Sequence, residues 1–354
     1  MSITKKFFGS LPDGSKIDIF TLQNSKNMSV DITNFGGIIV SLMVPDKNGN
    51  PADVTLGHDI LDKYFVNTEY FGALIGRHAN RIEDAKFELN GKEYELLKND
   101  GNNHLHGGSI GFHNVPWNAE IKNDNGIEKL VLTHRSPDGE ENYPGNLDVT
   151  VEYSLTDENE LVIGYNAVSD KDTVINLTNH AYFNLGGHAS GNVLKHQMYI
   201  NAESFTPVND ECLPTGEIRS VKGTVMDFTT LRSFEEDIDS NDEQIKNGLG
   251  YDHNWVLNTK GNLEEVAAEV YHPESGRAMQ VFTTKPGIQF YSGNHLSKNN
   301  DLIGKKNAVY PRRAGLCLET QFFPNAMKHK NFPSPVLKAG EKYHYITKYK
   351  FFTK

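Results

Sequence analysis

The stretch LDVTVEYSLTDENELVIGYNA, residues 147–167, decides the fold class. Apolar residues occupy every second position from Leu147 to Leu155, and again from Leu161 to Ala167 after the polar segment TDENE. A period of two places one set of side chains on a single face of a strand. The pattern therefore predicts two strands that pair as a β-hairpin.

The same signal recurs along the chain. KFELNGKEYEL (86–96) predicts a hairpin in which Asn90 and Gly91 supply the positive φ angles of the turn. EVAAEVYHPESGRAMQVFTT (265–284) predicts another, turning within residues 273–276. Helical periodicity is weak, and only 59–65 and 231–239 are predicted as short helices. These features predict an all-β chain, built as a large antiparallel β-sandwich or barrel with a few short helices.

Composition limits the classes of function. The chain has 354 residues, of which 37% are hydrophobic and 23% charged, so it supports a sizeable core. The net charge of −11 argues against a nucleic-acid partner and against docking on anionic membranes. Two cysteines, Cys212 and Cys317, provide no disulfide framework. With no signal peptide, membrane span or linker recognised, we expect one soluble, cytoplasmic domain over residues 1–354.

Two histidines in NNHLHGG (102–108) raise the question of a metal site. His104 and His106 would share one face of a strand, as at the start of many metal sites. No carboxylate follows them before Glu120, so the ligand spacing does not favour a metal. The alternative is one structural histidine and one histidine that lines a site.

Other polar residues stand in apolar or aromatic surroundings. His180, in NLTNHAYFNLGG (176–187), is either a packed core histidine or part of a cleft edge. Arg77 is expected either to form a surface charge pair or to hold loop carbonyls, whereas for Arg81 such a role and ligand binding are equally open. Glu319 lies in the apolar stretch LCLETQ (316–321), where a buried carboxylate requires an explanation.

A third group combines hydrogen-bonding and aromatic side chains. In GYDHNWVL (250–257), Asp252 either binds hydroxyls or caps a turn, and Trp255 either stacks on a sugar or belongs to the core. The amide of Gln289 both donates and accepts, which suits binding to pairs of hydroxyls. The alternative is a strand residue whose hydrogen bonds are satisfied within the protein. No G-x-S-x-G elbow, P-loop or G-x-G-x-x-G motif is present in the sequence.

Taken in order, several motifs resemble the galactose mutarotase (aldose 1-epimerase) family. They are GRHANRI (76–82), NHLHGG (103–108) with GFHNVPW (111–117), NLTNHAYFNLGG, GYDHNWVL, GIQFYSGN (287–294) and GLCLETQ (315–321). The resemblance covers nearly the whole chain, and His78 is a departure outside the functional positions. It implies a single-domain β-sandwich with an open cleft, the supersandwich of this family. It also implies interconversion of the α and β anomers of free aldohexoses such as galactose and glucose, with neither cofactor nor metal.

The resemblance also implies roles for individual residues. Glu319 falls on the catalytic base and His180 on the catalytic acid. The sugar-contacting positions fall on Asn80, Arg81, His106, Tyr182, Asp252 and Gln289. Ordinary pKa values of about 4.3 for Glu and 6.5 for His predict an ionised base and a proton-donating acid near neutral pH.

Three alternative functions remain beside this hypothesis, and the oligomeric state is also open. A mutarotase for hexose 6-phosphates would need a cationic pocket, for which Arg77, Arg312 and Arg313 are candidates. A non-catalytic sugar-binding protein would need neither Glu319 nor His180. A metal-dependent β-barrel isomerase would be sensitive to chelators. The chain is expected to act as a monomer or a homodimer.

Overall fold

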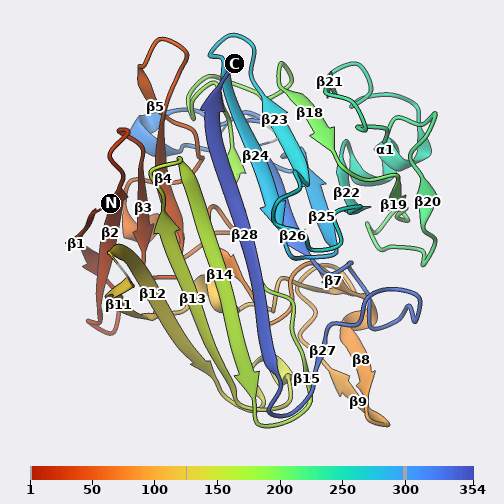
Figure 1. Cartoon of the computed structure of the whole chain (residues 1–354). Helices are drawn as coiled ribbons and strands as arrows, with labels where there is room; N and C mark the ends of the chain where they lie inside the picture. Colours follow the sequence, from red (N-terminus) through yellow and green to blue (C-terminus); the bar gives the residue numbers. More distant parts are fainter. Residues whose placement is uncertain (1, 125, 298–300) are drawn as a thin grey trace.

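Strands make up nearly all of the regular structure in the computed structural model, which describes residues 2–124, 126–297 and 301–354 (Figure 1). Every ladder between the named strands is antiparallel. The predicted all-β class and the antiparallel sandwich are therefore confirmed. No helix among the described residues is long and apolar enough to cross a membrane.

The largest sheet has nine strands and contains the predicted 147–167 hairpin. Its spatial order is β11 (Asn118–Asp124), β12 (Ile127–Ser136), β13 (Leu147–Leu155), β14 (Glu160–Ser169), β28 (Lys342–Thr353), β24 (Arg277–Thr283), β23 (Ala268–Tyr271), β18 (Gln197–Ile200) and β21 (Arg232–Ser233). β13 pairs with β14, and burial alternates along β13 as the period of two predicts. The predicted hairpin at 265–284 is present as β23 and β24.

A six-stranded sheet lies behind part of the nine-stranded sheet in Figure 1. Its order is β17 (Tyr182–Phe183), β26 (Leu316–Gln321), β25 (Gly287–Tyr291), β22 (Asp252–Val256), β19 (Ser204–Thr206) and β20 (Arg219–Ser220). All six residues of β26 are buried. Both faces of this strand are therefore covered by other parts of the protein, which accounts for the apolar character of LCLETQ.

Smaller sheets complete the fold. The N-terminal sheet runs in chain order through β1 (Ser2–Ser10), β2 (Lys16–Gln23), β3 (Ser29–Thr33), β4 (Ile39–Pro45) and β5 (Pro51–Asp53). Two-stranded ladders join β7 (Arg81–Ile82) to β10 (His104–Leu105), β6 (Leu74–Ile75) to β16 (Thr178–Asn179), β15 (Thr173–Val174) to β27 (Val336–Leu337), and β8 (Lys86–Leu89) to β9 (Lys92–Glu95). The last is the predicted 86–96 hairpin, with φ of 54° at Asn90 and 74° at Gly91.

The helix predictions were right once and wrong once. The segment 59–65 contains the 3-10 helix η1 (Leu61–Tyr64). The segment 231–239 is not helical, because the Arg232 guanidinium donates to the carbonyls of Val225 and Asp227 and to Asp237, and Arg232 pairs with Met198 in the sheet. These contacts, of which the pairing with Met198 is long-range, outweigh a weak local periodicity.

The α-helix of the described chain follows that segment, and four more 3-10 turns accompany it. The helix α1 (Glu243–Gly248) begins at Asp242, whose side chain accepts a hydrogen bond from the Gln244 N–H. This capping residue is a local signal for a helix start. The further 3-10 turns are η2 (Glu83–Ala85), η3 (Phe112–Asn114), η4 (Glu140–Asn142) and η5 (Lys305–Asn307).

The main hydrophobic core lies between the nine-stranded and six-stranded sheets. Val151 and Ile163 of the first sheet belong to one buried cluster with Phe290 and Leu318 of the second. Each large apolar side chain that is fully buried contributes about 1.5–3 kcal/mol. Because Leu316 and Leu318 face this core, the alternate residues of β26 face the opposite side of the sheet, where the candidate site lies.

Candidate active site

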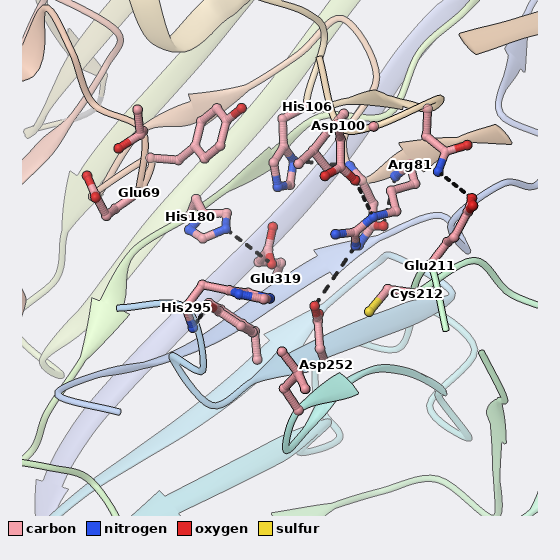
Figure 2. A pocket seen from close by; sticks show the side chains of 18 of the residues that line it. Glu69, Arg81, Asp100, His106, His180, Glu211, Cys212, Asp252, His295 and Glu319 are labelled. Atoms are coloured by element: carbon pink, nitrogen blue, oxygen red, sulfur yellow. Dashed lines mark hydrogen bonds and ion pairs between the residues drawn. The ribbon is translucent and has the colours of Figure 1, made fainter. Parts of the chain in front are cut away.

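A cavity of about 700 Å³ opens beside the six-stranded sheet (Figure 2). It gathers side chains that are far apart in the sequence. Seven of the eight residues predicted from the family resemblance line it, namely Asn80, Arg81, His106, His180, Tyr182, Asp252 and Glu319. The eighth, Gln289, is buried behind Asp252 and hydrogen-bonded to it.

Three neighbouring strands bring acidic and amide groups to one face of the sheet. Gln289 of β25 lies opposite Asn254 of β22 on one side and opposite Glu319 of β26 on the other. Side chains in register on adjacent strands point to the same face. The Gln289 amide donates to Asp252 Oδ1 over 2.7 Å. The sheet register therefore places the Asp252 and Glu319 carboxylates on the same side.

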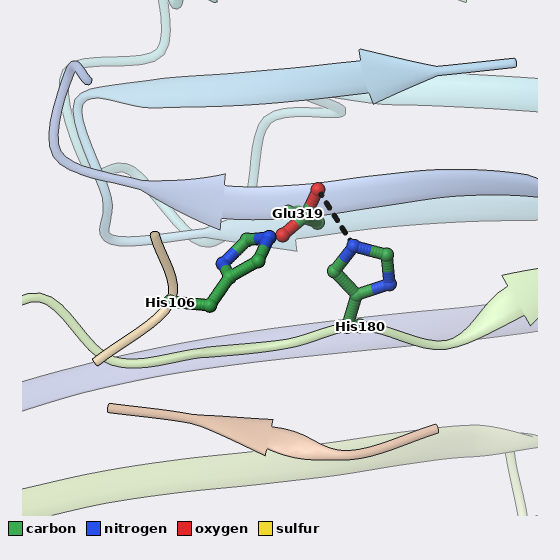
Figure 3. Close-up of side chains that lie close together, drawn as sticks. All are labelled: His106, His180 and Glu319. Carbon is green, nitrogen blue, oxygen red and sulfur yellow. Dashed lines mark ion pairs between the residues drawn. The ribbon is translucent and has the colours of Figure 1, made fainter. Parts of the chain in front are cut away.

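His180 lies between β16 and β17, next to Tyr182, which pairs with Cys317 of β26. Its Nε2 is 3.6 Å from Glu319 Oε1, and its Nδ1 is 3.6 Å from the Cys317 sulfur. The first distance is too long for a direct hydrogen bond. Figure 3 shows the imidazoles of His106 and His180 on either side of the Glu319 carboxylate.

The β7–β10 ladder supplies the opposite wall of the site. Leu105 pairs with Arg81, and the Asn80 N–H donates to Nδ1 of His106 over 3.2 Å. An Nδ1 that accepts a hydrogen bond leaves the ring proton of a neutral imidazole on Nε2. His106 therefore presents a hydrogen-bond donor to the cavity.

The backbone at His106 separates the two histidines of the motif. His106 has φ of 54°, and Gly107 follows with φ of 84°, where a Cβ would lie 1.9 Å from the Gly76 carbonyl oxygen. The expectation that His104 and His106 share a face is wrong, because the chain leaves the strand at this turn. His104 instead contacts the Leu97 carbonyl and the Tyr143 hydroxyl. The alternative of one structural and one site-lining histidine is confirmed.

The two arginines of GRHANRI also divide their roles. Arg77 is buried and donates to the carbonyls of Pro144 and Gly145, as expected of a structural arginine. Arg81 lines the cavity, with its Nε donating to Asp100 over 2.7 Å and its Nη1 lying 4.0 Å from Asp252 Oδ2. Trp255 is fully buried in the core, so the core alternative holds for this residue.

Burial shifts the pKa values of Glu319 and His180. Burial, with the Asp252 charge added, raises the pKa of Glu319 well above its ordinary value, and Arg81 opposes this shift. Burial lowers the pKa of His180 to about 4. Ordinary pKa values predicted the charged forms near neutral pH, whereas burial favours the neutral form of each group.

A metal ion does not fit the three central residues. His106, His180 and Glu319 each offer one ligand atom, and these atoms lie within 4.8 Å of one another. A metal-bound histidine normally donates its other ring N–H to an acceptor. His106 does the reverse, since its Nδ1 accepts from Asn80 and its Nε2 carries the proton. The donor set suits hydrogen bonding to a ligand rather than metal coordination.

Several lining residues were not predicted from the sequence. The Tyr70 ring packs against the imidazoles of His106 and His180, with centroids 4.7 Å and 5.8 Å away. Asp100 holds Arg81, while Glu69 and Glu211 add carboxylates to the wall. Asp100 precedes Gly101 directly before NNHLHGG, and an Asp-Gly pair is a local sequence signal for a turn. This signal could have placed Asp100 beside the motif. Tyr70 carries no comparable local signal.

Comparison of the whole chain with known proteins identifies its family. The family model described as Aldose 1-epimerase matches residues 18–350. The chain belongs to the aldose 1-epimerase family. Within it, the chain is 46% identical to galactose mutarotase of Bos taurus over 353 residues, covering 99% of each chain. It is 43% identical to galactose mutarotase of Homo sapiens, covering 99% of this chain and 98% of the relative.

Bacterial members of the aldose 1-epimerase family are also similar. Aldose 1-epimerase of Escherichia coli is 35% identical over 342 residues, with 96% of each chain covered. The crystal structure of galactose 1-epimerase from Lactobacillus acidophilus superposes with a TM-score of 0.87 at 29% identity, covering 99% of each chain. The family's sandwich is therefore the fold of this chain over nearly its whole length.

Proposed function

We propose that this aldose 1-epimerase interconverts the α and β anomers of free aldohexoses such as galactose and glucose by acid–base ring opening and reclosure. The observation that carries the proposal is the position of two proton-transfer groups in one cavity. His180 Nε2 and Glu319 Oε1 lie 3.6 Å apart, and Glu319 Oε2 has no hydrogen-bond partner among the described residues. Both groups are thus available to a ligand.

In the proposed reaction, each residue moves one proton. Glu319 removes the proton from the anomeric hydroxyl while His180 donates a proton to the ring oxygen. The bond between the anomeric carbon and the ring oxygen breaks, and the free aldehyde forms. Rotation about the C1–C2 bond presents the other carbonyl face. The ring then closes as His180 takes back its proton and Glu319 returns the other one, so no net proton or electron is exchanged.

The electrostatics of the cavity agree with this cycle. Ring opening requires an ionised Glu319 and a protonated His180, and it leaves both residues neutral. Burial favours the neutral forms, which is the protonation state of the ring-opened intermediate. The Arg81 charge lowers the pKa of Glu319 and so supports the ionised state that begins the reaction. The charged state that begins the reaction and the neutral state that follows ring opening are thereby brought closer in free energy.

The remaining residues are proposed to hold the sugar hydroxyls. His106 offers its Nε2–H, Arg81 offers guanidinium donors, and Asp252 offers an acceptor oxygen. Asn80 and Tyr182 line the same space, and Gln289 supports Asp252. We further propose that residues 1–354 act as one domain in the cytoplasm, without a nucleic-acid partner, as a monomer or a homodimer.

The charges of the cavity do not favour a phosphorylated sugar. None of Arg77, Arg312 and Arg313 lines the cavity: the first two donate to backbone carbonyls, and Arg313 pairs with Asp239. The wall carries the carboxylates of Glu69, Asp100, Asp210 and Glu211, which outnumber its cations, Arg81 and Lys246. These charges repel a phosphate dianion.

Polarimetry tests the proposed function. Crystalline α-D-galactose is dissolved with and without the protein, and the experiment is repeated with α-D-glucose and with EDTA. We expect faster approach to the same final rotation, unchanged by EDTA. A different final rotation, or no acceleration with either sugar, would overturn the proposal.

A further inference from the structure

A chain of buried amides runs from β26 to the Asp252 carboxylate. The Gln321 Nε2 donates to Gln289 Oε1 over 3.0 Å, and the Gln289 Nε2 donates to Asp252 Oδ1 over 2.7 Å. The three residues lie on neighbouring strands of one sheet, and their exposures are 0% for Gln321, 3% for Gln289 and 8% for Asp252. Hydrogen bonds in such a dry region are costly to lose.

The direction of these bonds is fixed by the chemistry at each end. An ionised carboxylate only accepts, so Gln289 must turn its NH2 group toward Asp252. Its carbonyl oxygen then points away from Asp252 and needs a donor. Gln321 supplies that donor, and its Nε2 also lies 3.5 Å from Asn254 Oδ1. A 180° flip of the Gln289 amide would bring its oxygen against Asp252 and its NH2 group against the Gln321 donor.

We propose that Gln321 is a positioning residue of the sugar site, acting through Gln289 on Asp252. Its N–H supplies the donor that the Gln289 oxygen needs in the amide orientation that holds Asp252 Oδ1, and so stabilises that orientation. The other oxygen, Oδ2, remains on the side of Arg81, 4.0 Å from its Nη1 (Figure 2), and is free to accept from a sugar hydroxyl. One face of β26 thus carries Glu319 and, two residues later, Gln321. The inference rests on the proposed function, since it concerns how the same cavity binds its sugar.

The main test replaces Gln321 with leucine, which keeps a similar size and removes the donor. The matched control is Thr320→Val, because Thr320 is equally buried on the same strand but contacts the Thr347 hydroxyl. For Gln321→Leu we expect the KM for galactose to rise about tenfold, while kcat changes less than about threefold because Glu319 and His180 are unaltered. Thr320→Val is expected to lower Tm without changing KM. An unchanged KM in a folded Gln321→Leu variant overturns the inference.

A second variant, Gln321→Glu, covers the case in which leucine prevents folding. A protonated carboxyl donates its O–H to Gln289 Oε1, whereas a carboxylate only accepts. Burial at this position raises the pKa of a carboxyl above its ordinary value of about 4.3, so raising the pH from 5 to 9 removes the donor, and KM relative to the wild type is expected to rise at least about fivefold. A ratio that stays constant over this range contradicts the inference, because a purely structural role would lower Tm without a pH-dependent KM.

The wild-type protein separates the two proposals. If it fails to accelerate mutarotation, the proposed function is rejected, and calorimetric titration with galactose then measures Kd for the wild type and for Gln321→Leu. A weaker Kd in the variant still supports the positioning role. Equal Kd values, or no binding of galactose to either protein, reject it.

Discussion

Replacing Glu319 with glutamine tests the proposed base with the least change in shape. The side chain is 2% exposed, and its Oε2 makes no hydrogen bond to the described residues. Glutamine occupies nearly the same volume and is neutral, but its amide does not accept a proton at neutral pH. The substitution therefore removes the proposed chemistry while leaving the packing of β26 in place.

The expected loss of activity follows from the role of the carboxylate. A positioned general base contributes about 10²–10⁴-fold to a rate. We expect kcat of Glu319→Gln to fall at least about 100-fold, which corresponds to about 2.7 kcal/mol of transition-state stabilisation. KM for galactose is expected to change little, because the hydroxyl-binding residues remain.

The same substitution has a predicted effect on stability. The folded-state pKa of Glu319 is raised, so the wild-type protein loses stability as pH rises from the unfolded value of about 4.3 toward the folded-state pKa. Glutamine carries no such titration. The variant should therefore match the wild type at acidic pH and be more stable than it at pH 8.

Polarimetry with α-D-galactose measures the activity, and thermal unfolding at pH 5 and pH 8 measures the stability. Circular dichroism checks that the strand content is retained. A folded variant with less than a tenfold loss of kcat would refute the assignment of Glu319 as the base. A Tm below that of the wild type at pH 8 would refute the conclusion that the buried carboxyl is held neutral.

Three further results are expected. His180→Asn should lower kcat at least about 100-fold because the proton for the ring oxygen is lost; polarimetry of the folded variant checks this, and a loss below tenfold would count against it. The pair carries one proton before ring opening, on His180, and one proton after it, on Glu319, so kcat/KM should stay level through neutral pH, between the lowered pKa of His180 and the raised pKa of Glu319. Its acid limb should lie near the His180 pKa of about 4, and half-loss near pH 6.5 would contradict the effect of burial. Asp100→Ala should raise KM about fivefold with kcat retained, because Arg81 loses a charged hydrogen-bond partner; steady-state kinetics at several galactose concentrations measure it, and a fall in kcat alone would contradict a role in binding.

Local patterns were sufficient where the structure depends on neighbours in sequence. The hairpins at 86–96, 147–167 and 265–284 formed as predicted, because alternation and turn residues act within a few positions. The 231–239 helix did not form, because Arg232 pairs with the distant Met198 in the sheet and donates to the carbonyls of Val225 and Asp227. The motif set also identified the family, and seven of the eight residues carried over from it line one cavity.

What the sequence alone determined was the β class, the main hairpins and the family with its candidate residues. Only the tertiary structure decided which polar groups share a space, because Arg81, His180 and Glu319 meet through pairing of strands distant in the chain. It also decided the protonation of the site. A side chain's ordinary pKa belongs to its residue type, whereas the shifts at His180 and Glu319 arise from burial, which exists only once the sheets have packed.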